Sequence, residues 1–202
     1  MWTECAIIRD MKESLRPTVW RTARALANVN RLKFLRAVFA AKGTKGVSVL
    51  ADELGLSVPT ASVYLRALNA RGLVDVKRES SHVYYGCGGD RSLPEAQSLQ
   101  SAFARMFARK DLPDDWPSRA IPILQAYANE RRIEIVKTLA ANGPLTFTAL
   151  LRLAGIPETS LLRHLSLLVE GGVVALDDKR QYCVAKPKDA LRSTLLTMAT
   201  GG

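Results

Sequence analysis

The 202-residue chain has little of the chemistry on which enzymes and metal proteins depend. It contains only two histidines, His82 and His164. No carboxylate pair, glycine-rich phosphate loop or nucleophile motif accompanies them, so we expect neither catalytic activity nor a cofactor. The three cysteines, Cys5, Cys87 and Cys183, are widely spaced. An odd number at such spacing argues against a disulfide framework and predicts a reducing, cytoplasmic environment.

Long apolar runs are also missing. No stretch reaches the roughly 20 apolar residues that a membrane helix needs. Arg9 and Asp10 interrupt the apolar residues near the N-terminus. The sequence therefore predicts neither a membrane span nor a signal peptide.

Negative charge is the scarcer sign, and the formal net charge is +10. This excess indicates a polyanionic partner, although a well-solvated basic surface would give the same number. Residues 1–90 contain 14 Lys and Arg against 8 Asp and Glu, whereas residues 113–202 contain 11 against 9. Any electrostatic attraction is therefore expected mainly from the first half of the chain.

The chain does have an internal repeat. LANVNRLKFLRAVFAAKG (26–43) returns as YANERRIEIVKTLAANG (127–143), and LGLSVPTASVYLRALNARGLV (54–74) returns as AGIPETSLLRHLSLLVEGGVV (154–174). The offset is about 100 residues, which indicates a duplicated domain because solenoid repeats run to roughly 20 to 50 residues.

The repeat predicts two domains, 1–110 and 118–202, joined by a Pro- and Asp-rich linker at 111–117. Apolar spacing and turn residues set the expected helices of both domains. Those helices are 3–15, 18–41, 47–54, a recognition-type helix between Ser57 and Gly72, 93–110, 121–142, 147–154, 157–170 and 187–198. A change to alternating apolar residues predicts a β-hairpin in each copy, with RESSH (78–82) at the first tip and Asp177-Asp178-Lys179 at the second turn.

Two short helices with a glycine-containing turn, followed by a hairpin, make a winged helix-turn-helix. LANVNRLKFLRAV, LADELGLSVPTASVYLRAL and GLVDVKRESSHVYY resemble the second helix, helix-turn-helix and wing of the ArsR-type (arsenical-repressor-like) regulators. The second copy keeps YANERRIEIVKTL and RHLSLLVEGGVV. The resemblance implies a mainly α fold with small β-hairpin wings, in tandem winged helix-turn-helix domains, and a prokaryotic DNA-binding transcriptional regulator, expected to be a repressor.

The chain departs from this family at two points. Family members usually carry one such domain and dimerise, whereas this chain carries two. Metal-sensing members place cysteines in the short helix before the recognition helix, and the corresponding stretches here, VSVLADELGL and LTFTALLRLAGI, have none. We therefore expect no metal site.

The first recognition helix is expected to bury Ala61, Leu65 and Leu68 and to turn its other side to DNA. Such a helix needs short hydrogen-bonding side chains at its start and cations for phosphates or guanines. The first wing adds cations and a histidine that can follow the phosphate backbone. The residues expected at the DNA are Ser57 (also an N-cap candidate), Thr60, Ser62, Tyr64, Arg66, Lys77, Arg78 and His82.

The second copy is a weaker candidate for DNA binding. Its helix presents Glu158 and Leu162 where the first copy has Val58 and Ser62, and its wing carries Asp177 and Asp178. Arg163 and His164 are the candidate DNA contacts of this copy. The alternative is a copy that serves dimerisation or ligand sensing.

The partner is expected to be double-stranded DNA. The segments 3–15, 93–110 and 187–198 could pair within one chain as a pseudo-dimer or between two chains as a homodimer, and the sequence does not choose. Because a fold does not fix a function, the rival class is a protein-interaction scaffold built on winged helices. For Cys87 and Cys183, near the ends of hairpin strands, small buried strand residues are favoured over a redox or metal pair.

Overall fold

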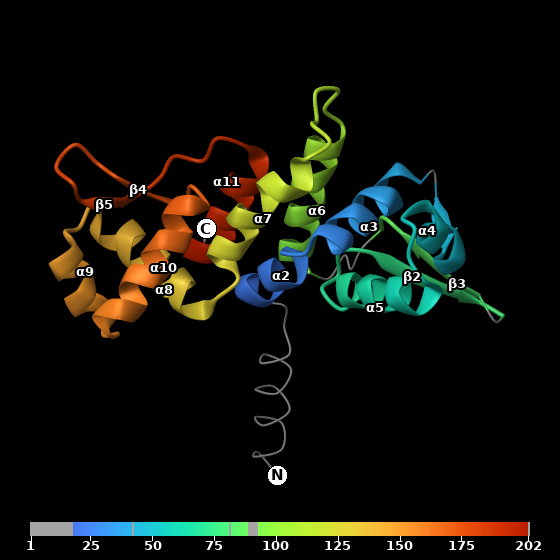
Figure 1. Ribbon diagram of the computed structural model, residues 1–202, viewed down its shortest axis with the longest axis horizontal. Helices are drawn as coiled ribbons and strands as arrows, with labels where there is room; N and C mark the ends of the chain where they lie inside the picture. Colours follow the sequence, from blue (N-terminus) through green and yellow to red (C-terminus); the bar gives the residue numbers. More distant parts are fainter. Residues whose placement is uncertain (1–17, 42, 81, 89–92, 202) are drawn as a thin grey trace, which may run out of the picture.

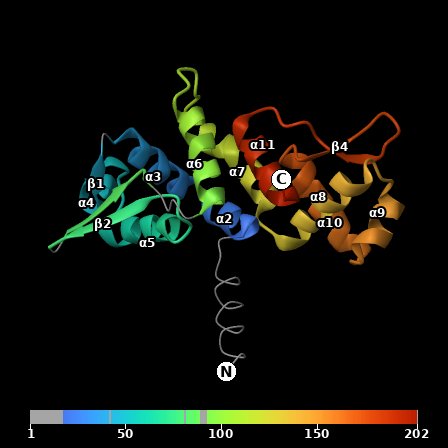
Figure 2. The ribbon, with the colours of Figure 1, turned by 180° about the vertical axis from the view of Figure 1, so that it is seen from behind.

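The molecule is elongated, with a helix-turn-helix lobe at each end and a group of helices between them (Figures 1 and 2). The structure is a computed structural model, and it describes residues 18–41, 43–80, 82–88 and 93–201. The helix expected at residues 3–15 and Cys5 lie outside these ranges.

The first copy has the helix-turn-helix and the wing that the sequence predicts. Its β1, β3 and β2 form an antiparallel sheet in that order. Its elements are α2 (Val19–Leu26), α3 (Val29–Ala40), β1 (Thr44–Gly46), α4 (Val47–Glu53), α5 (Val58–Asn69), β2 (Asp75–Glu79), β3 (His82–Gly86) and α6 (Pro94–Phe107).

The second copy repeats this order. In place of β1 it has a single antiparallel bridge between Leu145 and Tyr182. Its elements are α7 (Trp116–Tyr127), α8 (Glu130–Asn142), α9 (Phe147–Ala154), α10 (Glu158–Glu170), β4 (Val174–Leu176), β5 (Tyr182–Val184) and α11 (Ala190–Thr200). The prediction of tandem winged helix-turn-helix domains is confirmed.

The predictions of one long helix at 18–41 and another at 121–142 are wrong for the same reason. Each segment is two helices, because an asparagine begins the second one. Asn28 accepts a hydrogen bond from the backbone N–H of Arg31 (3.0 Å), and Asn129 does the same for Arg132 (3.3 Å). A side-chain oxygen at this position satisfies a backbone donor that has no partner inside the helix.

An arginine in the first turn of α3 and of α8 also donates hydrogen bonds to carbonyls of the helix that precedes it. Arg132 donates from Nε to the Ala126 carbonyl (2.9 Å) and from Nη2 to the Gln125 carbonyl (2.6 Å). In the first copy, Arg31 donates from Nη2 to the Arg24 carbonyl (3.4 Å). The carbonyls at a helix C-terminus lack partners and carry partial negative charge, so a guanidinium there stabilises the break.

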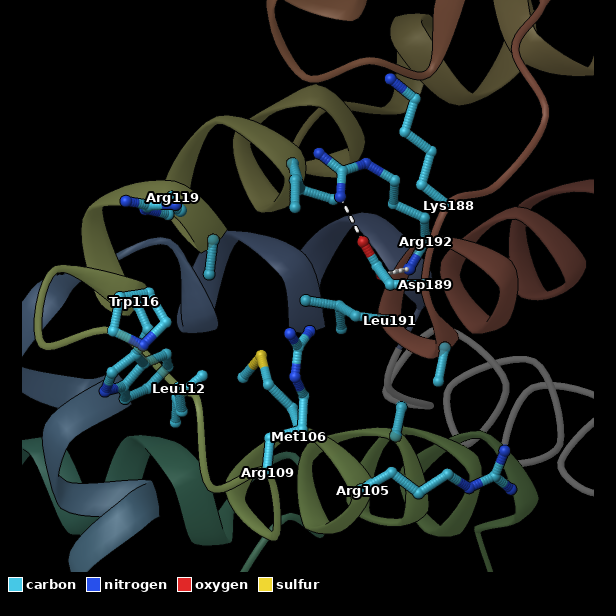
Figure 3. A pocket seen from close by; sticks show the side chains of 15 residues that line it. Arg105, Met106, Arg109, Leu112, Trp116, Arg119, Lys188, Asp189, Leu191 and Arg192 are labelled. Carbon is cyan, nitrogen blue, oxygen red and sulfur yellow. Dashed lines mark hydrogen bonds and ion pairs between the residues drawn. The ribbon is translucent and has the colours of Figure 1, made fainter.

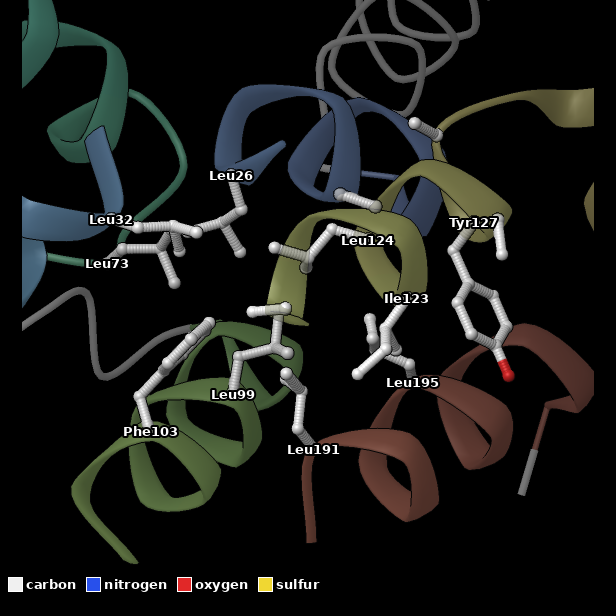
Figure 4. Close-up of a cluster of buried hydrophobic side chains, with 14 of the residues drawn as sticks. Leu26, Leu32, Leu73, Leu99, Phe103, Ile123, Leu124, Tyr127, Leu191 and Leu195 are labelled. Carbon is white, nitrogen blue, oxygen red and sulfur yellow. The ribbon is translucent and has the colours of Figure 1, made fainter. Parts of the chain in front are cut away.

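Corresponding helices of the two copies pack on one another at the centre: α2 on α7, and α6 on α11. Figure 4 shows the apolar side chains that fill this region. They come from both copies, and five of them are at most 3% exposed: Leu26, Leu99, Leu124, Leu191 and Leu195. One continuous apolar core therefore joins the two copies.

Three details differ from the sequence-based expectation. The segment expected to break the chain after α3 contains β1, which pairs with β3. Trp116, expected in the linker, is the first residue of α7 and is 4% exposed. The C-cap of α5 is Ala70 rather than Gly72, which takes a left-handed φ of +66° two residues later and so turns the chain into the wing. Within the described ranges, no helix is long and apolar enough to cross a membrane.

Candidate DNA-binding surface

The recognition helix α5 is anchored by one apolar stripe. Ala61, Leu65 and Leu68 are fully buried, as their i, i+4, i+7 spacing predicts. Ser57 caps the start of α5: its hydroxyl accepts from the Thr60 backbone N–H (3.4 Å) and lies 2.9 Å from the Thr60 hydroxyl. The first turn is thereby fixed, with both hydroxyls at the surface end of the helix.

The opposite side of α5 faces solvent. Val58, Pro59, Val63 and Arg66 are exposed, whereas Thr60, Ser62 and Tyr64 are partly exposed. The Arg66 guanidinium donates from Nε to the Ser62 carbonyl of its own helix (3.2 Å). Of the described carboxylates, none pairs with Arg66, so its charge is available to a phosphate.

Tyr64 is held by packing rather than presented at the surface. Its ring lies 6.0 Å from that of Phe34, between centroids, at a tilt of 44°. Burial lowers the pKa of Arg31, and the Tyr64 phenol nearby acts in the opposite direction. Tyr64 therefore remains a marginal candidate for a phosphate contact.

The register of the wing places its two cations on opposite faces. Lys77 pairs with Tyr84, and Arg78 pairs with Val83. Neighbouring residues of a strand point to opposite faces of the sheet, and directly paired residues share a face. Lys77 is further neutralised by Glu79 at 2.5 Å, so Arg78 is the better placed of the two for DNA.

Tyr85 brings the recognition helix and the wing together. It is 3% exposed and shares its sheet face with Arg78. Burial raises the pKa of its phenol, while the charges of Arg66 and Arg78 act in the opposite direction. Arg66 of α5 and Arg78 of β2 are therefore both close enough to Tyr85 for their charges to act on its phenol. Sequence reasoning missed Tyr85, and its place in the wing's alternating pattern was the available signal.

His82 lies at the wing tip, as expected. It is exposed, and its ring centroid is 6.4 Å from that of Tyr84 on the same face of the hairpin. This is the face of Lys77, since Glu79, Lys77 and their partners share it. His82 and Lys77 therefore form a separate group from Arg66 and Arg78.

The second recognition helix, α10, exposes the residues that its spacing predicts: Glu158, Thr159, Leu162, Arg163 and Ser166. Arg163 lies near other arginines. Its charge and that of Arg24 both act on the guanidinium of Arg132, whose pKa is lowered chiefly by burial. Arg24 of α2 in the first copy therefore lies near the start of α8 in the second copy, and sequence analysis did not find this because the two are far apart in the chain.

His164 is buried, which argues against the direct DNA contact that the sequence predicted for it. It is 8% exposed, and its Nδ1 is buried with no hydrogen-bond partner in the described structure. Desolvation lowers its pKa, and Arg132, Arg163 and Arg131 lower it further. A histidine one residue after an exposed arginine points a quarter-turn or more away from it, here into the core.

Of the cysteines in the described ranges, Cys87 and Cys183 are both free thiols. Cys87 is exposed, which contradicts its expected burial in a strand. Cys183 is partly buried and its thiol lies 3.6 Å from the Ala175 carbonyl. Within the described ranges, no three residues among His, Cys, Asp and Glu come together in a way that could hold a metal ion.

Comparisons with known proteins agree with this geometry. Residues 28–76, which span α3 to the start of the wing, match the family described as bacterial regulatory protein, arsR family. Residues 127–177, the corresponding part of the second copy, match a helix-turn-helix domain family. The chain therefore contains two ArsR-like helix-turn-helix domains in tandem.

A curated relative is the HTH-type transcriptional regulator Rv0324 of Mycobacterium tuberculosis. It is 38% identical over 81 residues, which cover 40% of this chain and 35% of the relative. The match thus spans about a third of that regulator. No solved structure matches the chain significantly.

Proposed function

We propose that this protein is a sequence-specific DNA-binding transcriptional regulator in which the first copy is the main reader. The exposure of Arg66 on α5 and of Arg78 on the wing, both near enough to Tyr85 for their charges to act on its phenol, carries this proposal most directly. The two arginines join the recognition helix and the wing into one cationic surface, and cations on both elements suit phosphates on the two sides of a groove. The family matches and the regulator from Mycobacterium tuberculosis support the same class.

In this proposal α5 enters the major groove by its N-terminal half. Thr60 and Ser62 offer hydroxyls to base edges, and Arg66 reaches a phosphate or a guanine. Arg78 follows the backbone from the wing, and Lys77 and His82 contact DNA only if it curves around the hairpin. The Ser57 hydroxyl is already engaged with Thr60, so its first role is to cap the helix.

The second copy contributes through charge more than through base contacts. Arg163 on α10, with Arg131 and with Arg24 from α2, forms a basic cluster around the buried His164 and Arg132. Glu158 and Leu162 on the same helix disfavour close base contact. We therefore expect the second copy to bind the phosphate backbone with little sequence preference.

One chain then acts as a pseudo-dimer. The packing of α2 on α7 and of α6 on α11 supports this arrangement, because each pair joins corresponding helices of the two copies. A regulator with one such domain would need two chains for the same contact. As a reader of bacterial DNA, the protein would work in the cytoplasm, as a repressor and without enzymatic activity.

Selection of duplexes from a random pool, followed by light scattering of the selected complex, tests the proposal. The expected result is an enriched motif bound by a single chain. Enrichment with two chains per duplex would replace the pseudo-dimer by a homodimer. Failure to enrich any motif would contradict sequence-specific DNA binding and favour the alternative function, a protein-interaction scaffold built on winged helices.

A further inference from the structure

A cavity of about 530 Å³ lies where the two copies meet, apart from both recognition helices. Its walls are α6 of the first copy, the connection and α7, and the start of α11 (Figure 3). Pockets that bind small molecules measure roughly 300–1,000 Å³ and often lie at domain interfaces. The proposed DNA contacts leave this cavity unused.

The lining of the cavity is partly apolar and partly charged. Figure 3 shows Leu112 and Trp116 at one end and Lys188 and Arg192 at the other. Arg109 extends between them beside Met106. A ligand that fills this space needs an apolar body and a polar head.

The charge of the lining selects the sign of that head. Of the fifteen lining residues, Asp189 is the one carboxylate, against the cations Arg105, Arg109, Arg119, Lys188 and Arg192. Carboxylates from outside the lining pair with two of these: Asp111 with Arg109 at 2.7 Å, and Asp115 with Arg119 at 2.9 Å. Once these pairs are counted, two positive charges remain in excess.

Hydrogen-bond donors also remain free among the lining cations. Arg109 uses Nε and Nη2 for Asp111, which leaves its Nη1 group without a hydrogen bond in the described part of the chain. Arg192 uses Nη1 for Asp189, and Lys188 makes no ion pair with the described residues. A carboxylate accepts from such donors in charge-assisted hydrogen bonds.

We propose that this cavity binds an organic carboxylate with an extended apolar body, such as a medium-chain fatty acid. The carboxylate lies at the open Nη1 group of Arg109, Lys188 adds positive charge to the same cavity, and the hydrocarbon lies against Met106, Leu112 and Trp116. Burial of the hydrocarbon supplies affinity in proportion to its apolar area, and the cations fix its direction.

The ligand would touch both copies, since Arg109 follows α6 and Lys188 precedes α11. The packing of α6 on α11 helps set how the two recognition helices are placed relative to one another. Where DNA and the ligand prefer different placements or the same one, the ligand changes DNA affinity, and DNA changes ligand affinity by the same factor. This regulatory step rests on the proposed function, whereas binding itself does not.

Titration calorimetry of the full chain with decanoate, in the absence of DNA, tests the site. Decan-1-ol is the neutral probe of equal chain length. The double variant R109Q/K188Q removes two lining cations, and K110Q/K186Q removes two exposed cations that are their close neighbours in the sequence and do not line the cavity. Circular dichroism of each variant checks that it is folded.

The proposal requires that wild type and K110Q/K186Q bind decanoate equally. It also requires binding at least tenfold weaker for decan-1-ol and for R109Q/K188Q. Absence of decanoate binding to wild type would overturn the site, and so would equal binding by R109Q/K188Q, which would mean nonspecific association through the alkyl chain.

A DNA titration with and without decanoate tests the regulatory step separately. The expected result is a DNA affinity that decanoate shifts at least threefold in wild type and not in R109Q/K188Q. Decanoate binding with unchanged DNA affinity would refute the regulatory step and keep the site. A wild type that binds decanoate but no DNA would refute the proposed function alone.

Discussion

Replacing Arg66 by Gln should remove one phosphate contact from the protein–DNA complex. Arg66 is exposed on α5, its guanidinium donates to its own helix, and it pairs with none of the described carboxylates. Neutralising one phosphate contributes about 0.9 to the slope of log K against log salt concentration. Extrapolated from 1 M to about 0.1 M salt, this slope corresponds to a roughly eightfold loss of affinity, or about 1.2 kcal/mol.

Fluorescence anisotropy on a labelled duplex, from about 50 to 200 mM salt, measures both the affinity and its slope. The matched control is Arg36→Gln, which removes the same charge from an exposed position on α3. Both substitutions should change the free energy of unfolding by less than about 0.5 kcal/mol, because neither side chain is buried. If Arg66→Gln has the same salt slope as wild type, Arg66 does not contact a phosphate. If Arg36→Gln loses as much DNA affinity as Arg66→Gln, the loss comes from the change in net charge and not from a contact.

Three further predictions follow from the wing, the helix breaks and the buried histidine. Arg78→Gln should weaken DNA binding more than Lys77→Gln, because the two residues lie on opposite faces of the wing and Lys77 is paired with Glu79. The same anisotropy assay compares the two variants, and a larger loss of affinity for Lys77→Gln would contradict the assigned face. Asn28→Ala and Asn129→Ala should each lower the free energy of unfolding in urea by about 1 kcal/mol through loss of an N-cap, and unchanged stability would show that the caps do not hold the breaks. Burial lowers the pKa of His164 below its ordinary 6.5, so the unfolded chain binds a proton that the folded chain excludes, and stability should fall as the pH drops through about 6.5 toward the lower folded value. His164→Asn should flatten urea-unfolding stability across that window, and an unaltered pH dependence would refute the assignment.

The sequence predicted what local periodicity and duplication encode. The stripe of Ala61, Leu65 and Leu68 is buried as its spacing requires, and the wing forms where apolar residues begin to alternate. The exposure of Glu158, Leu162 and Arg163 on α10 also agrees with the sequence, whereas His164 of the same helix is buried. These features depend on neighbours within one or two turns, so they are visible in the chain itself.

The errors have physical reasons. Leu26-Ala27 and Tyr127-Ala128 favour helix, and the apolar spacing continues across both breaks, so periodicity alone joined the helices. The repeated asparagine that follows was the overlooked signal, since Asn is a preferred N-cap.

Other features depend on contacts between distant segments. The burial of His164 results from the packing of α10 against α7 and α8, and the effect of Arg24 on Arg132 results from the packing of the first copy on the second. The cavity likewise needs α6, α7 and α11 to meet. No local pattern in the sequence reports such contacts, because they depend on how the two copies pack.

The most direct test of the account is anisotropy of the wild-type protein on random-sequence duplex DNA across a salt series. A cationic surface that binds phosphates predicts binding at low salt, with log K falling linearly and steeply as log salt rises. Absence of binding at low salt would contradict the claim that this protein binds DNA.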